Sequence, residues 1–166
     1  LAIEPEPLCC LETTDEALAF FDRLRREAAS RGVEEIARQH LGLCYDVCHQ
    51  SVEFEDVSAS IRAIERASVR INKVHISCAL RLERPAENRE GRDALRRFVE
   101  PRYLHQTIAR LPDGRLARTV DLTESSLDSP GDEALSADEW RIHFHVPVDL
   151  TRIGPLGTTR DDLREA

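Results

Sequence analysis

Three segments of the chain have the apolar pattern of β-strands, residues 1–7, 40–46 and 70–77. In the first segment, apolar and polar residues alternate around Ile3. Pro5 and Pro7 limit regular strand pairing in the later part of the segment. The second is apolar nearly throughout, as expected of a strand whose sheet is covered on both faces. These segments predict three strands of one sheet.

Helical spacing separates these strands. The pair Thr13 and Glu16 matches a capping box, and the apolar residues that follow recur at helical spacing. A shorter helix is expected over residues 33–39, and another starts at Asp56 or Ser58. The order strand, helix, strand, helix, strand predicts a parallel sheet with right-handed crossovers.

The second half of the chain lacks this regular alternation. Two apolar segments flank Pro112-Asp113-Gly114 and predict a β-hairpin over residues 103–122. The other predicted segments are a loop at 85–92, a short helix at 93–99, a polar mobile loop at 125–138, a strand at 140–148 and the first turn of a helix at 158–163.

Carboxylates and imidazoles lie at the carboxyl ends of the predicted strands. Asp46 and His49 follow the second strand, and His75 lies near the end of the third. Carboxyl ends of parallel strands meet at one edge, and these side chains are good ligands for a divalent metal. We therefore expect one metal site with Zn, Mn or Fe. Its candidate ligands are Glu4, Asp46, His49, His75, His105, His143 and His145.

Each candidate also has a structural interpretation. Glu4 and Glu6 share one side of their strand and are the candidate catalytic acid or base, or else a solvent-facing pair. Asp46 is a metal ligand or the cap of the next helix. His143 and His145 point to one face as ligands, or they belong to an exposed edge strand.

Composition narrows the class of protein. The 166 residues suit one domain, and the net charge of -8 disfavours nucleic acid as a partner. No apolar run approaches the ~20 residues of a membrane helix. Five cysteines in apolar contexts indicate reduced thiols in a cytoplasmic protein, with Cys44 and Cys48 as structural thiols rather than zinc ligands. The absence of Met and the strand at residue 1 lead us to expect a piece of a longer chain.

The motif LGLCYDVCH resembles the sixth-strand motif of the xylose isomerase-like TIM barrels, which include sugar isomerases and epimerases and endonuclease IV-type enzymes. Together with LAIEPEPLCCLET, INKVHISCALRL, RYLHQTIAR and RIHFHVPVDL, it resembles the EboE family of metabolite traffic proteins. The resemblance implies that Glu4 is the fifth-strand ligand, Asp46 and His49 the sixth-strand pair, and His75 the seventh-strand ligand.

The resemblance also implies the fold and the function. Residues 1–166 would form a single partial (β/α)8 TIM-barrel domain, strands five to seven with a hairpin insertion, without the N-terminal half and the eighth strand. The implied function is an EboE-like metabolite traffic protein that binds or acts on a small sugar-like or prenyl-linked metabolite through a metal. The alternatives are a sugar (phosphate) isomerase or epimerase and an endonuclease IV-like phosphodiesterase. Whether the chain is an enzyme stays open.

Overall fold

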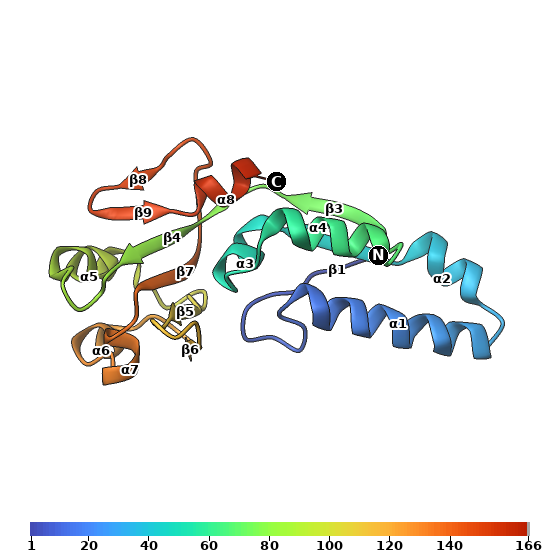
Figure 1. The fold of residues 1–166 in the computed structure, drawn as a ribbon, viewed down its shortest axis with the longest axis horizontal. Coiled ribbons are helices and arrows are strands. Elements are labelled where there is room, and N and C mark those ends of the chain that lie inside the picture. The colour runs from blue at the N-terminus through green and yellow to red at the C-terminus, as the bar shows by residue number, and fades with distance from the viewer. Residues whose placement is uncertain (166) are drawn as a thin grey trace.

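Two β-sheets organise the chain in a computed structural model that describes residues 1–165 (Figure 1). Sheet A is parallel, with the order β1-β2-β3. Sheet B is antiparallel, with the order β6-β5-β7-β4-β9-β8. The strands are β1 (Ala2–Ile3), β2 (Gly42–Asp46), β3 (Ile71–His75), β4 (Cys78–Glu83), β5 (Thr107–Arg110), β6 (Leu116–Thr119), β7 (Glu139–Val146), β8 (Arg152–Ile153) and β9 (Leu156–Thr158).

Helices flank both sheets. In Figure 1 the first, second and fourth helices lie beside sheet A, and the fifth to seventh lie beside sheet B. Within residues 1–165, no helix is both long and apolar enough to cross a membrane. The helices are α1 (Thr14–Ser30), α2 (Glu34–His40), α3 (Val47–Val52), α4 (Val57–Arg66), α5 (Arg89–Leu95), the 3-10 helix η1 (Arg96–Phe98), α6 (Glu124–Asp128), α7 (Asp132–Leu135) and α8 (Arg160–Glu165).

The helices predicted around sheet A are confirmed, and their ends have the expected caps. Thr13 and Glu16 form the capping box of α1, and the Asp56 side chain accepts a hydrogen bond from the Ala59 N–H at the start of α4. Their apolar residues, including Phe21 and Ile64, pack on one face of sheet A. This packing gives sheet A one covered face.

The side chains of strand β2 alternate between the two faces of sheet A. All five of its residues are buried. Leu43 and Tyr45 join the cluster with α1 and α4. Because side chains alternate along a strand, Cys44 and Asp46 point to the opposite face. Asp46 is paired with His75 of β3 in the parallel register, so the two residues are neighbours at the carboxyl end of the sheet.

The prediction of a partial (β/α)8 barrel is wrong. After β3 the chain passes through Ile76 and Ser77 directly into β4, which pairs antiparallel with β7 and β9. A barrel requires a helical crossover and a further parallel strand at this point. The apolar segment Cys78–Glu83 follows too closely for a crossover, so it turns back into a second sheet. The parallel part is limited to three strands among residues 1–165.

The second half contains further differences from the sequence-based prediction. The hairpin is confirmed as β5 and β6, and the late strand as β7. The prediction of a mobile loop at 125–138 is wrong, because α6 and α7 form there and Thr123 caps α6. Helix α3 and strands β4, β8 and β9 were not predicted. Each is six residues or shorter, and such segments carry little periodicity.

Glu53 is a buried carboxyl group whose state depends on pH. Its Oε2 lies 2.6 Å from Nη2 of Arg118, whereas its buried Oε1 has no hydrogen-bond partner among the described residues. Burial raises the pKa of Glu53 from 4.5 to about 7, although Arg118 acts in the opposite direction. The folded state therefore holds this proton more tightly than the unfolded state does. Its contribution to the unfolding free energy is fully present below the unfolded-state pKa and is lost as pH rises through the folded-state pKa.

We therefore expect Glu53→Gln to become more stable relative to wild type as pH rises. Between about pH 5 and about pH 8, the difference in unfolding free energy should shift in favour of the variant by about 2 kcal/mol. Urea unfolding at several pH values measures it. Glu87→Gln, at an exposed ion pair, should show no such shift. A constant difference for Glu53→Gln would mean that Glu53 is ionised throughout.

Candidate metal centre

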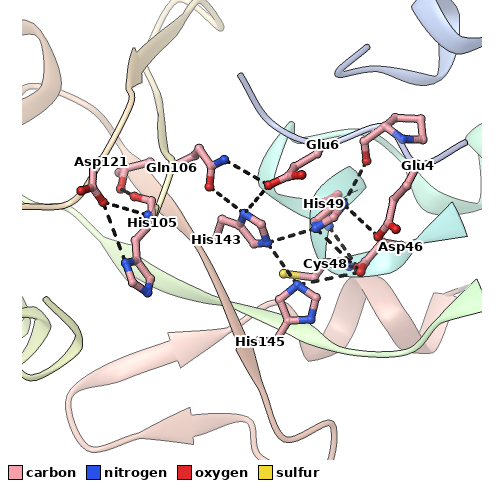
Figure 2. A network of polar contacts seen from close by, with 12 residues as sticks. Glu4, Glu6, Asp46, Cys48, His49, His105, Gln106, Asp121, His143 and His145 are labelled. Carbon is pink, nitrogen blue, oxygen red and sulfur yellow. Dashed lines mark hydrogen bonds and ion pairs between the residues drawn. The ribbon is translucent and has the colours of Figure 1, made fainter. Parts of the chain in front are cut away.

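Side chains from both sheets converge at the carboxyl end of sheet A. Glu4 follows β1, Asp46 ends β2 and His75 ends β3. Strand β7 of sheet B brings His143 and His145 to the same place. Figure 2 shows these two imidazoles and His49 of α3 pointing toward one another, with Asp46 beside them. The sheet A ligands were expected from strand order, but the contribution of sheet B depends on how the two sheets pack.

Asp46 uses its two oxygens differently. Oδ1 accepts hydrogen bonds from the backbone N–H groups of Cys48 at 2.8 Å and His49 at 3.4 Å, and from the Ser77 hydroxyl at 3.4 Å. Oδ2 lies 3.1 Å from Nδ1 of His75 and 3.8 Å from Nε2 of both His49 and His145. The carboxylate is fully buried. It therefore caps α3 with one oxygen and presents the other to three histidines.

The partners of His49 and His143 determine which ring nitrogen carries hydrogen. Nδ1 of His49 lies 2.9 Å from the carbonyl oxygen of Pro5, which can only accept. Nδ1 of His143 lies 2.7 Å from Oε1 of Gln106, and the Gln106 Nε2 donates to Glu6 at 3.2 Å, which orients the amide. In its neutral form, each ring therefore carries its hydrogen on Nδ1 and a lone pair on Nε2.

These two lone pairs face each other. Nε2 of His49 and Nε2 of His143 are 3.0 Å apart, and Nε2 of His145 lies 3.1 Å from that of His143. Two unprotonated nitrogens at this distance repel unless a proton or a cation lies between them. Zn–N distances of about 2.0–2.1 Å place neighbouring ligand atoms about 3.3 Å apart in a tetrahedron. The observed spacings are close to that value.

Burial favours the neutral form of His143 and His145. Removal from water, with His49 and His145 nearby, lowers the pKa of His143 to about 3. Burial also lowers the pKa of His145, although the Asp46 carboxylate acts in the opposite direction. Neutral imidazole is the form that coordinates metal ions. His143 and His145 therefore need not lose a proton at neutral pH before they can act as ligands.

Among residues 1–165, three groups of side chains could hold a metal ion, and the ligand atoms of each group lie within 4.8 Å of one another. In the group closest to β3, Nδ1 of His75 is 3.0 Å from Oε1 of Glu4 and 3.7 Å from Sγ of Cys44. The other two groups share His145. The groups are Asp46, His49 and His145; Cys48, His143 and His145; and Glu4, Cys44 and His75.

Two predicted residues lie away from these groups. His105 is buried with its ring stacked on Phe144, at 5.0 Å between centroids. Its nitrogens lie 3.9 Å from Glu100 and from Asp121, and it belongs to none of the three groups. Glu6 lies 3.8 Å from Nδ1 of His143 and is linked to that ring through Gln106. It is therefore beside the cluster rather than within it.

Sequence reasoning missed Gln106 and the placement of Cys48. Gln106 directly precedes β5, and its carbonyl accepts the His143 N–H at 2.8 Å because β5 lies next to β7. The sequence predicts both strands but not their pairing. Cys48 is fully buried, and burial raises its thiol pKa well above the ordinary value. The thiol lies near His143 and His145, which a residue spacing of nearly 100 does not reveal.

Replacing Gln106 by Leu should weaken metal binding without removing any ligand. The variant loses the acceptor that holds the proton on Nδ1 of His143. The tautomer that leaves the Nε2 lone pair free to bind the metal is then no longer favoured. Loss of such an orienting partner lowers metal affinity by roughly 10- to 100-fold. Competition with a chromophoric chelator measures the change. Gln39→Leu, in exposed α2, is the matched control, and equal affinities of the two variants would contradict an orienting role.

Comparison of the whole chain with protein-family models, with curated proteins and with solved structures finds no match.

Proposed function

We propose that this chain binds a divalent metal ion through His49, His143, His145 and Asp46, with a fifth coordination position open to substrate, and that the bound ion serves in a reaction on a small metabolite. The single observation that carries the proposal is the 3.0 Å approach of the Nε2 atoms of His49 and His143, two rings whose Nδ1 atoms face hydrogen-bond acceptors. Buried imidazoles held in this way, beside a buried carboxylate oxygen, are typical of metal ligands whose outer partners fix the tautomer.

The donor set favours zinc over magnesium or calcium. Three imidazoles and one carboxylate suit Zn²⁺ and also Fe²⁺ or Mn²⁺, whereas magnesium and calcium prefer oxygen donors. Cys48 lies nearby, but burial raises the pKa of its thiol, so the preference rests on the imidazoles and the carboxylate. Oδ2 of Asp46 also lies close to His75, which together with Glu4 offers a second position beside the first.

Two partly exposed carboxylates are available to move protons. When bound, a divalent metal polarises substrate oxygens or lowers the pKa of bound water. Glu4 contacts His75 and is the better candidate for a ligand. Glu6 is oriented by the Gln106 amide and lines the hollow next to His143, so it is the better candidate for the acid or base. Proton transfer on a metabolite that is held by the metal, as in an isomerase or epimerase, follows from this arrangement.

Membership of the EboE family of metabolite traffic proteins also stays a proposal. Glu4, Asp46 and His75 lie at the carboxyl ends of three parallel strands, which supports the resemblance in that part of the chain. Sheet B offers no such support. The phosphodiesterase alternative is disfavoured, because a net charge of -8 opposes binding to a phosphate backbone.

Metal content tests the proposal. The chain is purified without chelator, and its metals are measured by mass spectrometry beside the double variant Asp46→Ala/His75→Ala. We expect stoichiometric metal in wild type, loss in the double variant, and retention in His105→Ala, which lies outside the three groups. If wild type carries no metal and takes up none on titration with Zn²⁺, Mn²⁺ or Fe²⁺, the proposal is wrong.

A further inference from the structure

A hollow of about 610 Å³ opens beside the histidine cluster. It is within the range of about 300–1,000 Å³ that small-molecule sites occupy. His143 and His145 belong both to its lining and to the group that contains Cys48. A molecule in this hollow is therefore in contact with residues that also offer ligand atoms to the proposed metal.

Part of the lining of the hollow is apolar. Tyr103 and Leu104 line it, although they are 67% and 55% exposed to solvent. Both side chains are large, and both line the same hollow. Phe144 completes this apolar lining, and it is held between Phe98 and His105, each at 5.0 Å between ring centroids.

The segment that carries Tyr103 and Leu104 is anchored although it forms no helix or strand. The Glu100 carboxylate accepts hydrogen bonds from the backbone N–H groups of Arg102 at 3.0 Å and Tyr103 at 2.8 Å. These two bonds order the backbone that carries Tyr103 and Leu104. Local backbone order reduces the ordering cost of binding.

We infer that this hollow binds the apolar body of a small molecule whose oxygen-bearing head coordinates the metal held by the histidine cluster. The inference rests on the proposed function and narrows its substrate class. The hydroxyl groups of a sugar body would lie against Tyr103, Leu104 and Phe144 and lose hydrogen bonds to water. A metabolite with a ring-sized or larger apolar part fits this apolar lining, and Glu6 and Gln106, which lie beside His143, add polar groups to the same hollow.

Two hydroxamic acids test the inference, because they share a metal-binding head and differ in their apolar body. Acetohydroxamate and benzohydroxamate are titrated into the zinc-loaded chain, and binding is followed by calorimetry. We expect benzohydroxamate to bind at least about tenfold more tightly, because its phenyl ring leaves water. In the double variant Tyr103→Ser/Leu104→Ser the advantage should fall below about threefold, with acetohydroxamate unchanged.

Exposed apolar residues elsewhere supply the control. Ile36→Ser removes a comparably exposed side chain from α2 and should leave both affinities unchanged. Equal binding of the two probes to the zinc-loaded chain would overturn the inference while the metal proposal stands. So would a benzohydroxamate advantage that survives in the double variant, or binding of neither probe to zinc-loaded chain. Failure to load zinc at all would instead overturn the proposed function, and the inference with it.

Discussion

Asp46→Asn should lower the affinity of the chain for Zn²⁺ by about 100-fold or more. Loss of an outer partner that orients a ligand lowers metal affinity by about 10- to 100-fold, and loss of a ligand should cost at least as much. The amide keeps an oxygen that can accept from the Cys48 N–H at the start of α3. It loses the negative charge that Oδ2 presents to His75, His49 and His145. Zinc affinity is measured by competition with a chelator, and folding by thermal denaturation.

Asp56→Asn is the matched control for this change. Asp56 also caps a helix, with its side chain accepting from the Ala59 N–H, but it belongs to none of the metal-binding groups. We expect it to leave zinc affinity unchanged. The two variants thereby separate the roles of ligand and cap, the alternatives that the sequence leaves open for Asp46. Unchanged zinc affinity in Asp46→Asn would leave Asp46 as a helix cap only.

Leu80→Ala should destabilise the chain by about 2–5 kcal/mol. Leu80 is fully buried at the centre of sheet B, where β4 pairs with Ile142 of β7 on one side and with Thr158 of β9 on the other. It belongs to one core cluster with Leu82, Trp140 and other buried residues of sheet B. The cavity cannot collapse easily, so the loss of apolar contact adds to the cost of the void.

Urea unfolding measures the loss of stability in Leu80→Ala. Leu150→Ala, at a half-exposed position that follows β7, should change the unfolding free energy by less than about 0.5 kcal/mol. A loss below about 1 kcal/mol in Leu80→Ala would show that sheet B relaxes around the void. Because β7 carries His143 and His145, a large loss would also connect the stability of sheet B to the candidate metal centre.

Much of sheet A could be predicted because its signals are local. The capping box at Thr13, the Asp56 cap and the apolar residues of β2 act within a few positions of each other. Strand order then brings Asp46 and His75 together, since parallel neighbours end at the same edge. Three of the predicted site residues are adjacent for this reason, with Glu4 following β1.

The direction of the chain after β3 could not be predicted in the same way. A parallel continuation and an antiparallel return both begin with an apolar strand, and Cys78–Glu83 has no periodicity that separates them. The resemblance to a barrel family favoured the parallel continuation. The pairing of β4 with β7 depends on residues about 60 positions later, and it excludes the barrel.

The sequence by itself determined the helices around sheet A, the hairpin of β5 and β6, and the set of carboxylates and histidines at strand ends, because these depend on neighbouring residues. Only the tertiary structure decided which of them meet. His143 reaches His49, 94 positions away, because α3 packs against β4 and β7. Gln106 orients the His143 ring because β5 pairs with β7, whereas the His105 ring stacks on Phe144. Such contacts arise from the burial of shared apolar surface between sheets, which residue spacing does not encode.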